Sequence, residues 1–245
     1  MPRGLPDDSN IVKEGPTWTL TDQAELAARL GSIVTFDRLG TVLDLETFAK
    51  GRSRWMESLW GVASGVYLSN DRSLVDGVSL RLVSGTGLTP ACQAMWYLAY
   101  PQLSRLGYEA SYAVGVQRYR LYHGFNVFKG IYYANFSLRW TLTTGVLEYR
   151  DITAVWLDTG INIAAYPNNY MFNRIKLVGN ALTEEYERLI INDNGYDMKG
   201  RYAERVGAVA DQHVEAWSNS WGDGVFSQNT FLDACIFTES EPGIG

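Results

Sequence analysis

The chain has 245 residues, of which 46% are hydrophobic and 20% are charged. This is ordinary globular composition and enough length to bury a large core. The net charge of −6 and the absence of a basic cluster argue against nucleic-acid binding, which needs Lys and Arg to neutralise phosphates. The 15 Tyr and 8 Trp favour strands, where aromatic side chains fit a half-buried pleated surface.

The N-terminal residues 1–17 are rich in Pro, Gly and Asp and predict an extended arm. Acidic residues there leave no apolar core for a classical signal peptide, and no apolar run approaches the ~18 residues of a membrane span. A short helix should follow, because Asp22 and Glu25 can form a capping box and Gly31 is a natural stop. We expect an arm with a docking helix at 1–31 and one domain at 32–245, made as a soluble chain without membrane association.

From residue 32 onward, hydrophobic side chains recur every second residue, which is typical of strands. Val78, Leu80 and Leu82 alternate with polar residues in a half-buried strand. Residues 132–142 have the longest alternation, and a slip of one residue there would bury the polar set. Its predicted core face consists of Tyr132, Ala134, Phe136, Leu138, Trp140 and Leu142.

Gly-bearing turns separate the later strands and predict hairpins in series. These turns are Thr144-Gly145, Thr159-Gly160 and residues 192–195. The last strand is expected at 231–237, and the segment 204–217 is assigned to a covering loop or a strand. Successive hairpins indicate an antiparallel meander and an all-β domain rather than βαβ units.

Metal and nucleophile patterns are sparse. His123 and His213 have no second His or Cys at zinc spacing, and the acidic cluster at 193–197 suits a polar turn better than a calcium loop. His123 lacks a recognisable nucleophile or orienting carboxylate, so a structural role is favoured. We expect no metal and no cofactor. Cys92 and Cys235 are interpreted as buried thiols in preference to a disulfide.

A pair of carboxylates on one strand face would indicate a β-sandwich glycosidase, because those enzymes use two of them. Glu239 with Glu241 and Glu185 with Glu187 have i, i+2 spacing, but the first pair lies beside Pro242 and the second is expected on a solvated strand face. The chain is therefore expected to be non-enzymatic, with no catalytic residues.

Aromatic residues are the better candidates for a binding site. Trp217 and Trp221 flank a polar triplet before a Gly-rich segment, which suggests an irregular stretch, and Tyr119 and Tyr122 lie in a second aromatic stretch with interleaved arginines. Such rings can stack on sugars or on a partner chain. The alternative is that they cover the ends of a sandwich.

The segment 46–82 resembles the opening of concanavalin-like jelly-roll domains. The matching positions are Glu46, Phe48, Gly51, Trp55, Gly77, Ser79, Leu80 and Leu82. Asp233 in the closing strand and the pair 172–180 with 186–200 look similar too. The resemblance implies an antiparallel jelly-roll β-sandwich with an N-terminal arm and one short helix. Ala49 replaces an acidic residue found near a structural calcium in many relatives, and no E-x-D-x-x-E glucanase motif is present.

The resemblance therefore points to lectin-like modules and phage virion surface proteins. In the latter interpretation, apolar anchors Ile11, Val12 and Trp18 on the arm would bind a neighbouring subunit. The expected function is a structural or adhesive protein that forms homo-oligomers and decorates a phage capsid or tail in the virion; three-fold symmetry would follow from the phage analogy alone. The alternatives are a carbohydrate-binding module and, behind it, a β-sandwich glycoside hydrolase.

Overall fold

The structure is a computed structural model that describes residues 39–115, 119–166, 170–208 and 210–243. The predicted arm and helix at 1–31, with the anchors Ile11, Val12 and Trp18, lie outside the described residues. Within the described ranges every helix or strand assignment is a strand, and the strands form two antiparallel sheets. The predicted all-β jelly-roll sandwich is confirmed for this part of the chain.

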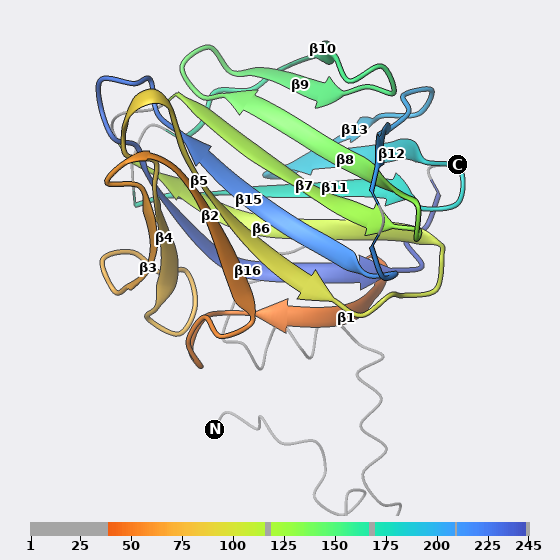
Figure 1. Ribbon diagram of the computed structural model, residues 1–245, viewed down its shortest axis with the longest axis horizontal. Coiled ribbons are helices and arrows are strands. Elements are labelled where there is room, and N and C mark those ends of the chain that lie inside the picture. The colour runs from red at the N-terminus through yellow and green to blue at the C-terminus, as the bar shows by residue number, and fades with distance from the viewer. Residues whose placement is uncertain (1–38, 116–118, 167–169, 209, 244–245) are drawn as a thin grey trace, which may run out of the picture. The chain divides into compact units, whose positions relative to one another are not determined.

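One sheet, here called the rear sheet, lies behind the other in Figure 1. Its strand order is β13 (Asn194–Asp197), β12 (Glu185–Ile191), β11 (Phe172–Asn180), β6 (Arg105–Val114), β16 (Asn229–Glu239), β4 (Ser79–Val83) and β3 (Gly65–Ser69), and β1 (Thr41–Glu46) pairs with β16.

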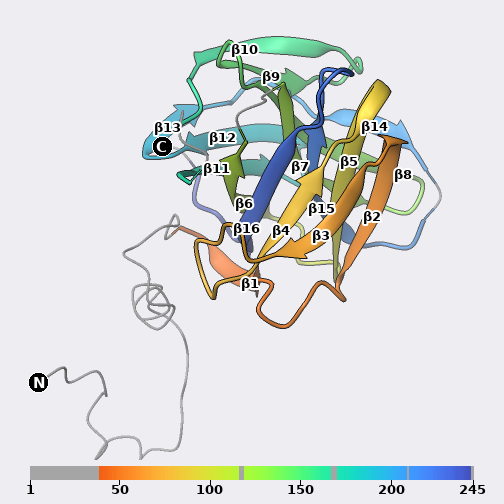
Figure 2. The ribbon, with the colours of Figure 1, turned by 90° about the vertical axis from the view of Figure 1, so that its left-hand side faces the viewer.

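The other sheet, here called the front sheet, presents β5, β15, β7 and β8 side by side in Figure 1. Its strand order is β10 (Trp156–Asn162), β9 (Val146–Arg150), β8 (Tyr132–Thr141), β7 (Arg120–Phe128), β15 (Val214–Trp221), β5 (Thr86–Leu98) and β2 (Trp55–Val62), and β14 (Glu204–Gly207) pairs with β8. Figure 2 shows the two layers from the side.

The core lies between the two sheets and is built from the inward half of each alternating strand. In β8 the predicted core residues Ala134, Phe136, Leu138 and Trp140 are all buried. The Phe136 ring stacks on Phe125 of β7 at 4.8 Å and meets Tyr186 of the rear sheet edge-on at 5.3 Å. Burial of each large apolar side chain contributes about 2–3 kcal/mol, so this layer holds the sheets together.

The positions that carry the jelly-roll resemblance are structural. Phe48 and Trp55 are buried, and the ring of Trp55 packs on Phe48 at 5.4 Å and on Trp96 at 5.5 Å. The buried carboxylate of Asp233 accepts hydrogen bonds from the backbone N–H of Leu74 (2.7 Å) and Val75 (3.1 Å). Asp233 thereby holds the loop before β4 against the closing strand β16.

Two of the three predicted turns are confirmed. Thr144-Gly145 joins β8 to β9, and Asn192-Asp193 joins β12 to β13, whose pairing starts at Ile191 and Asn194. The third prediction is wrong, because Thr159 and Gly160 lie inside β10, at an irregularity in its pairing with β9 where Gly160 adopts φ +77°.

The actual turn between β9 and β10 is organised by Asp151. Its carboxylate accepts the backbone N–H groups of Thr153 (3.0 Å) and Val155 (2.8 Å). The ambiguous segment 204–217 resolves into β14 and the start of β15, and the closing strand at 231–237 is confirmed within the longer β16.

Cys92 and Cys235 are unpaired and buried, on β5 and β16 respectively. Burial raises the pKa of the Cys92 thiol to about 12, so it stays protonated. No helix among the described residues is long and apolar enough to cross a membrane.

Candidate functional site

The outer face of the front sheet carries a row of polar and aromatic side chains that crosses its central strands. Leu121, His123 and Phe125 of β7 point into the core, so Tyr122 between them points outward. The pairing register continues this outward row from β9 to β5. Its members are Glu148, Arg139, Tyr122, Asn219 and Gln93, each opposite the next.

Trp217 and Trp221 belong to this same face, two residues either side of Asn219 on β15. Their predicted position in an irregular stretch is wrong, because both lie in a regular strand between β5 and β7. The ring of Trp221 lies 5.3 Å from that of Tyr122. The structure therefore brings three of the four predicted ligand-binding aromatics together, whereas the sequence separates them by almost a hundred residues.

The position of the Trp217 side chain depends on the absence of a side chain at Gly124. Trp217 sits opposite Gly124 of β7, and a Cβ atom built on Gly124 would lie 2.9 Å from Cζ2 of Trp217. The indole therefore lies across the sheet and is only 7% exposed. Trp217 forms the base of the face, and the half-buried Trp221 presents more of its surface.

Trp156 of β10 is a fourth ring, which the sequence analysis missed. It lies 5.5 Å from Tyr122, although β8 and β9 separate their strands. The guanidinium of Arg139 lies over the Trp156 ring at 4.7 Å and that of Arg150 at 5.5 Å. Only the strand order reveals this contact, since nothing local in the segment around Trp156 distinguishes it from a packing residue.

Tyr119, the fourth predicted residue, lies just outside the strand and has a different role. Its backbone N–H donates to the side-chain amide oxygen of Gln228, and its ring supports the guanidinium of Arg120 at 4.6 Å. Arg120 is opposite Trp221 in the pairing of β7 with β15. Tyr119 thus holds Arg120 beside the indole of Trp221.

Besides unpartnered buried atoms elsewhere in the described residues, such as Nε1 of Trp55 and of Trp96, four polar atoms of this face are buried without a hydrogen-bond partner. They are Oδ1 of Asn219, Nε1 of Trp221, Nε of Arg120 and Oδ1 of Asn126. Asn219 is only 8% exposed. A buried polar atom without a partner costs about 1–3 kcal/mol, and in native proteins such atoms are uncommon enough to require an explanation.

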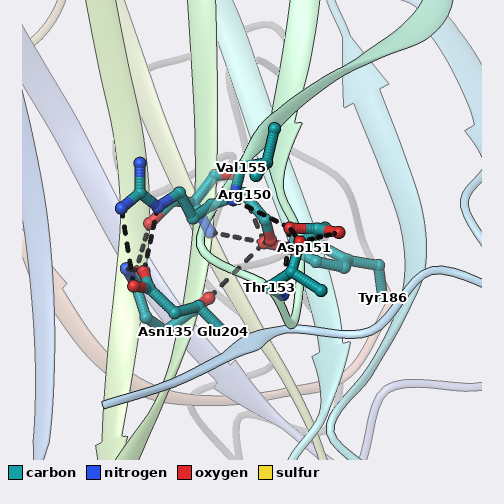
Figure 3. A network of polar contacts seen from close by, with 8 residues as sticks. Asn135, Arg150, Asp151, Thr153, Val155, Tyr186 and Glu204 are labelled. Carbon is teal, nitrogen blue, oxygen red and sulfur yellow. Dashed lines mark hydrogen bonds and ion pairs between the residues drawn. The ribbon is translucent and has the colours of Figure 1, made fainter.

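Two ion pairs organise the β9 side of the face. Arg139 Nε donates to Glu148 at 2.6 Å, with a second bond from its Nη2 to the same carboxylate. Figure 3 shows the neighbouring network, in which the Glu204 carboxylate accepts from Arg150 (3.1 Å) and Asn135 (2.9 Å). Tyr186 of the rear sheet donates its hydroxyl to the backbone oxygen of Arg150 at 2.8 Å, which ties this network to the core.

The charges around Tyr122 act on its hydroxyl. Burial raises the pKa of Tyr122, and the adjacent guanidinium groups of Arg139 and Arg120 partly offset that rise. Further along the face, burial raises the pKa of Glu215, whose carboxylate accepts the Asn126 amide at 3.3 Å. The face therefore presents aromatic surface, fixed guanidinium groups and one buried carboxyl.

The other sequence candidates lie elsewhere. His123 is buried between the sheets, where Nε2–H donates to Tyr108 O (3.0 Å) and Nδ1 accepts from the hydroxyl of Tyr112 (2.7 Å). The solvated face assigned to Glu187 is wrong, because that carboxylate is buried and accepts from Arg105 at 2.8 Å.

Glu241 is buried as well, and it pairs with Lys176 at 2.6 Å and with Arg188 at 2.5 Å. Both partners belong to strands of the rear sheet. No group of three or more metal-ligating side chains gathers in the part of the chain that the structure describes.

Comparison with solved structures identifies the fold as a concanavalin-like jelly-roll β-sandwich. The cellulose-induced protein Cip1 superposes with a TM-score of 0.55 and 11% identity, over 82% of this chain and 100% of that one. A conserved carbohydrate esterase from Shiga toxin-encoding bacteriophage phi24B gives 0.54 and 11%, over 82% and 99%. A sialidase gives 0.51 and 8%, over 84% of this chain but only 19% of the sialidase.

No protein-family model matches the chain, and no curated protein matches its sequence. At these identities the solved structures establish the fold and leave the function to be argued from the side chains.

Proposed function

We propose that the protein binds a carbohydrate chain on the outer face of the front sheet. The observation that carries the proposal is the combination of stacked aromatics with unsatisfied buried polar atoms on one face. Trp221 and Trp156 offer ring surface for the apolar faces of sugars. Oδ1 of Asn219 can accept a sugar hydroxyl, and Nε1 of Trp221 can donate to one.

Binding can be measured by calorimetry and by tryptophan fluorescence against a panel of neutral and acidic oligosaccharides. Trp221→Ala should weaken binding about tenfold or more, because loss of a central aromatic contact typically costs 1.4 kcal/mol or more. Tyr67→Ala is the matched control, since Tyr67 is an exposed ring on β3 of the rear sheet. Equal affinity of Trp221→Ala and the unchanged protein would refute the site.

The proposal is binding without turnover. The oligosaccharides that bind should be recovered at their original length after prolonged incubation. Shorter products would instead support a glycoside hydrolase, with Glu215 and Glu204 as the carboxylates to replace first, since both belong to strands of the front sheet.

Attachment to a larger particle is a second candidate, favoured by the edge formed by β2 and β3. The two strands end their respective sheets and lie close together in Figures 1 and 2. Large apolar side chains are exposed along this edge, on β2, β3 and the start of β5: Met56, Leu59, Trp60, Val62, Tyr67, Leu68 and Leu88. Such an edge supports self-association, as a virion surface protein would require. Self-association through this edge is tested by measuring the molar mass of the protein in solution.

A further inference from the structure

The side chains around the proposed carbohydrate site, on which this inference rests, bear on the charge of the ligand. Three guanidinium groups surround the aromatic rings of the face, those of Arg120, Arg139 and Arg150. Arg139 and Arg150 stand over Trp156, and Arg120 stands over Tyr119 beside Trp221.

Their charges are not equally balanced. Arg139 is paired with Glu148 and Arg150 with Glu204. Arg120 has no carboxylate within ion-pair distance among the residues that the structure describes, and its buried Nε–H has no hydrogen-bond acceptor. The charge of Arg120 is therefore not balanced by a carboxylate of the described protein, and its guanidinium, which also interacts with the Tyr122 hydroxyl, can pair with an anionic group of a ligand.

The position of Arg120 is fixed by the protein rather than by a ligand. Its guanidinium rests on the ring of Tyr119, and its backbone oxygen accepts from the side-chain amide of Gln228 at 3.4 Å. Arg120 also precedes Tyr122 by two residues on the same strand, so both side chains emerge on the outer face. A ligand that stacks on Trp221 would therefore lie within reach of the guanidinium fork.

We infer that the bound carbohydrate carries a carboxylate, as uronic acids and related acidic sugars do, and that Arg120 recognises it. A guanidinium binds a planar carboxylate through two parallel N–H···O bonds, which adds orientation to charge. The neutral groups beside it, the Asn219 amide and the Trp221 N–H, would form hydrogen bonds with the sugar hydroxyls.

The test compares each acidic oligosaccharide with its methyl ester, which keeps the sugar and removes the charge. The probes are oligogalacturonate, oligoglucuronate and alginate oligosaccharides, together with sialyllactose against lactose. At least one acid should bind tenfold or more tighter than its neutral counterpart at low ionic strength, and added salt should reduce the difference. Arg120→Gln should abolish the preference by weakening the binding of the acid to about the affinity of its neutral counterpart.

Two further variants separate recognition from simple charge or folding effects. Arg120→Lys keeps the charge but loses the fork and should retain only part of the preference. Arg81→Gln removes the same charge from β4 of the rear sheet and should leave the preference unchanged. Thermal unfolding of each variant checks that it folds.

The outcomes distinguish this inference from the proposed function. Binding of neutral sugars or methyl esters with equal or higher affinity than the acids would overturn the inference and leave the carbohydrate site intact. An acid preference that survives in Arg120→Gln would also overturn it. Failure of every oligosaccharide, acidic and neutral, to bind would refute the proposed function itself.

Discussion

His123 shows how one buried residue couples the stability of the fold to pH. The imidazole stacks on Tyr108 at 4.5 Å, and its two nitrogens are fully used by Tyr108 O and the hydroxyl of Tyr112. Because the Tyr108 backbone oxygen can only accept, Nε2 carries the proton and Nδ1 is the acceptor. Burial lowers the pKa of His123 to about 3, so the residue is neutral in the folded protein.

This arrangement predicts a pH-dependent stability difference. Between about pH 6.5 and 3 the unfolded chain binds a proton at His123, whereas the folded chain does not. The free energy of unfolding therefore falls as the pH falls through this window, by up to ~1.4 kcal/mol per pH unit. His123→Gln should be destabilised at pH 7, but the gap to the unchanged protein should narrow below pH 6.5. Urea unfolding at pH 7, 6, 5 and 4.5 measures it, and a constant gap would contradict a neutral buried histidine.

At the scale of the element, β7 links the core to the candidate site. Its inward residues Leu121 and Phe125 pack between the sheets, and its outward residues Tyr122 and Gly124 lie under the proposed ligand. The absence of a side chain at Gly124 allows the Trp217 indole to lie across the strand. A change on the outer face of β7 should therefore alter the binding surface and the stability of the sheet together.

Gly124→Ala tests this coupling. The added Cβ would lie 2.2 Å from the backbone oxygen of Phe136 and 2.9 Å from Cζ2 of Trp217, so the strand or the indole must shift. We expect a loss of about 1–3 kcal/mol in unfolding free energy and a changed tryptophan emission spectrum.

Gly195→Ala is the matched control for this change, because no atom lies within 4 Å of its added Cβ. It should be neutral or slightly stabilising, since alanine restricts the unfolded chain more than glycine does. An equal loss of stability in both variants would show that the crowding at Gly124 has no special effect.

At the scale of the whole molecule, the edge where β2 and β3 end the two sheets is a candidate surface for self-association. Large apolar side chains are exposed on β2, on β3 and at the start of β5, where Leu88 is 95% exposed. An unprotected apolar edge favours pairing with a second copy of the chain.

Light scattering of the full chain should accordingly give a defined multiple of 27.4 kDa. Replacing Trp60 and Leu88 together by Glu should shift the mass toward the monomer, because the charges would be buried in the contact. Ile131→Glu changes an exposed apolar residue outside this edge and should leave the mass unchanged. A monomeric full chain at all concentrations would contradict self-association.

The sequence by itself determined the strand content, most of the inward face of β8, and the turns at Thr144-Gly145 and Asn192-Asp193. These features depend on alternation and on turn chemistry, which act over a few neighbouring residues and can be read locally. The predicted turn at Thr159-Gly160 is wrong because a glycine inside an irregular strand and a glycine in a turn have similar local sequence patterns.

Only the tertiary structure decided which strands are neighbours, and the site depends on that order. Trp217 and Trp221 could be suspected from composition, but their place beside Tyr122 follows from β15 pairing with β7. Trp156 reaches the site only because the meander brings β10 onto the same face. Cross-strand partners lie tens to about a hundred residues apart, and their choice is set by the burial of the whole core rather than by any local preference.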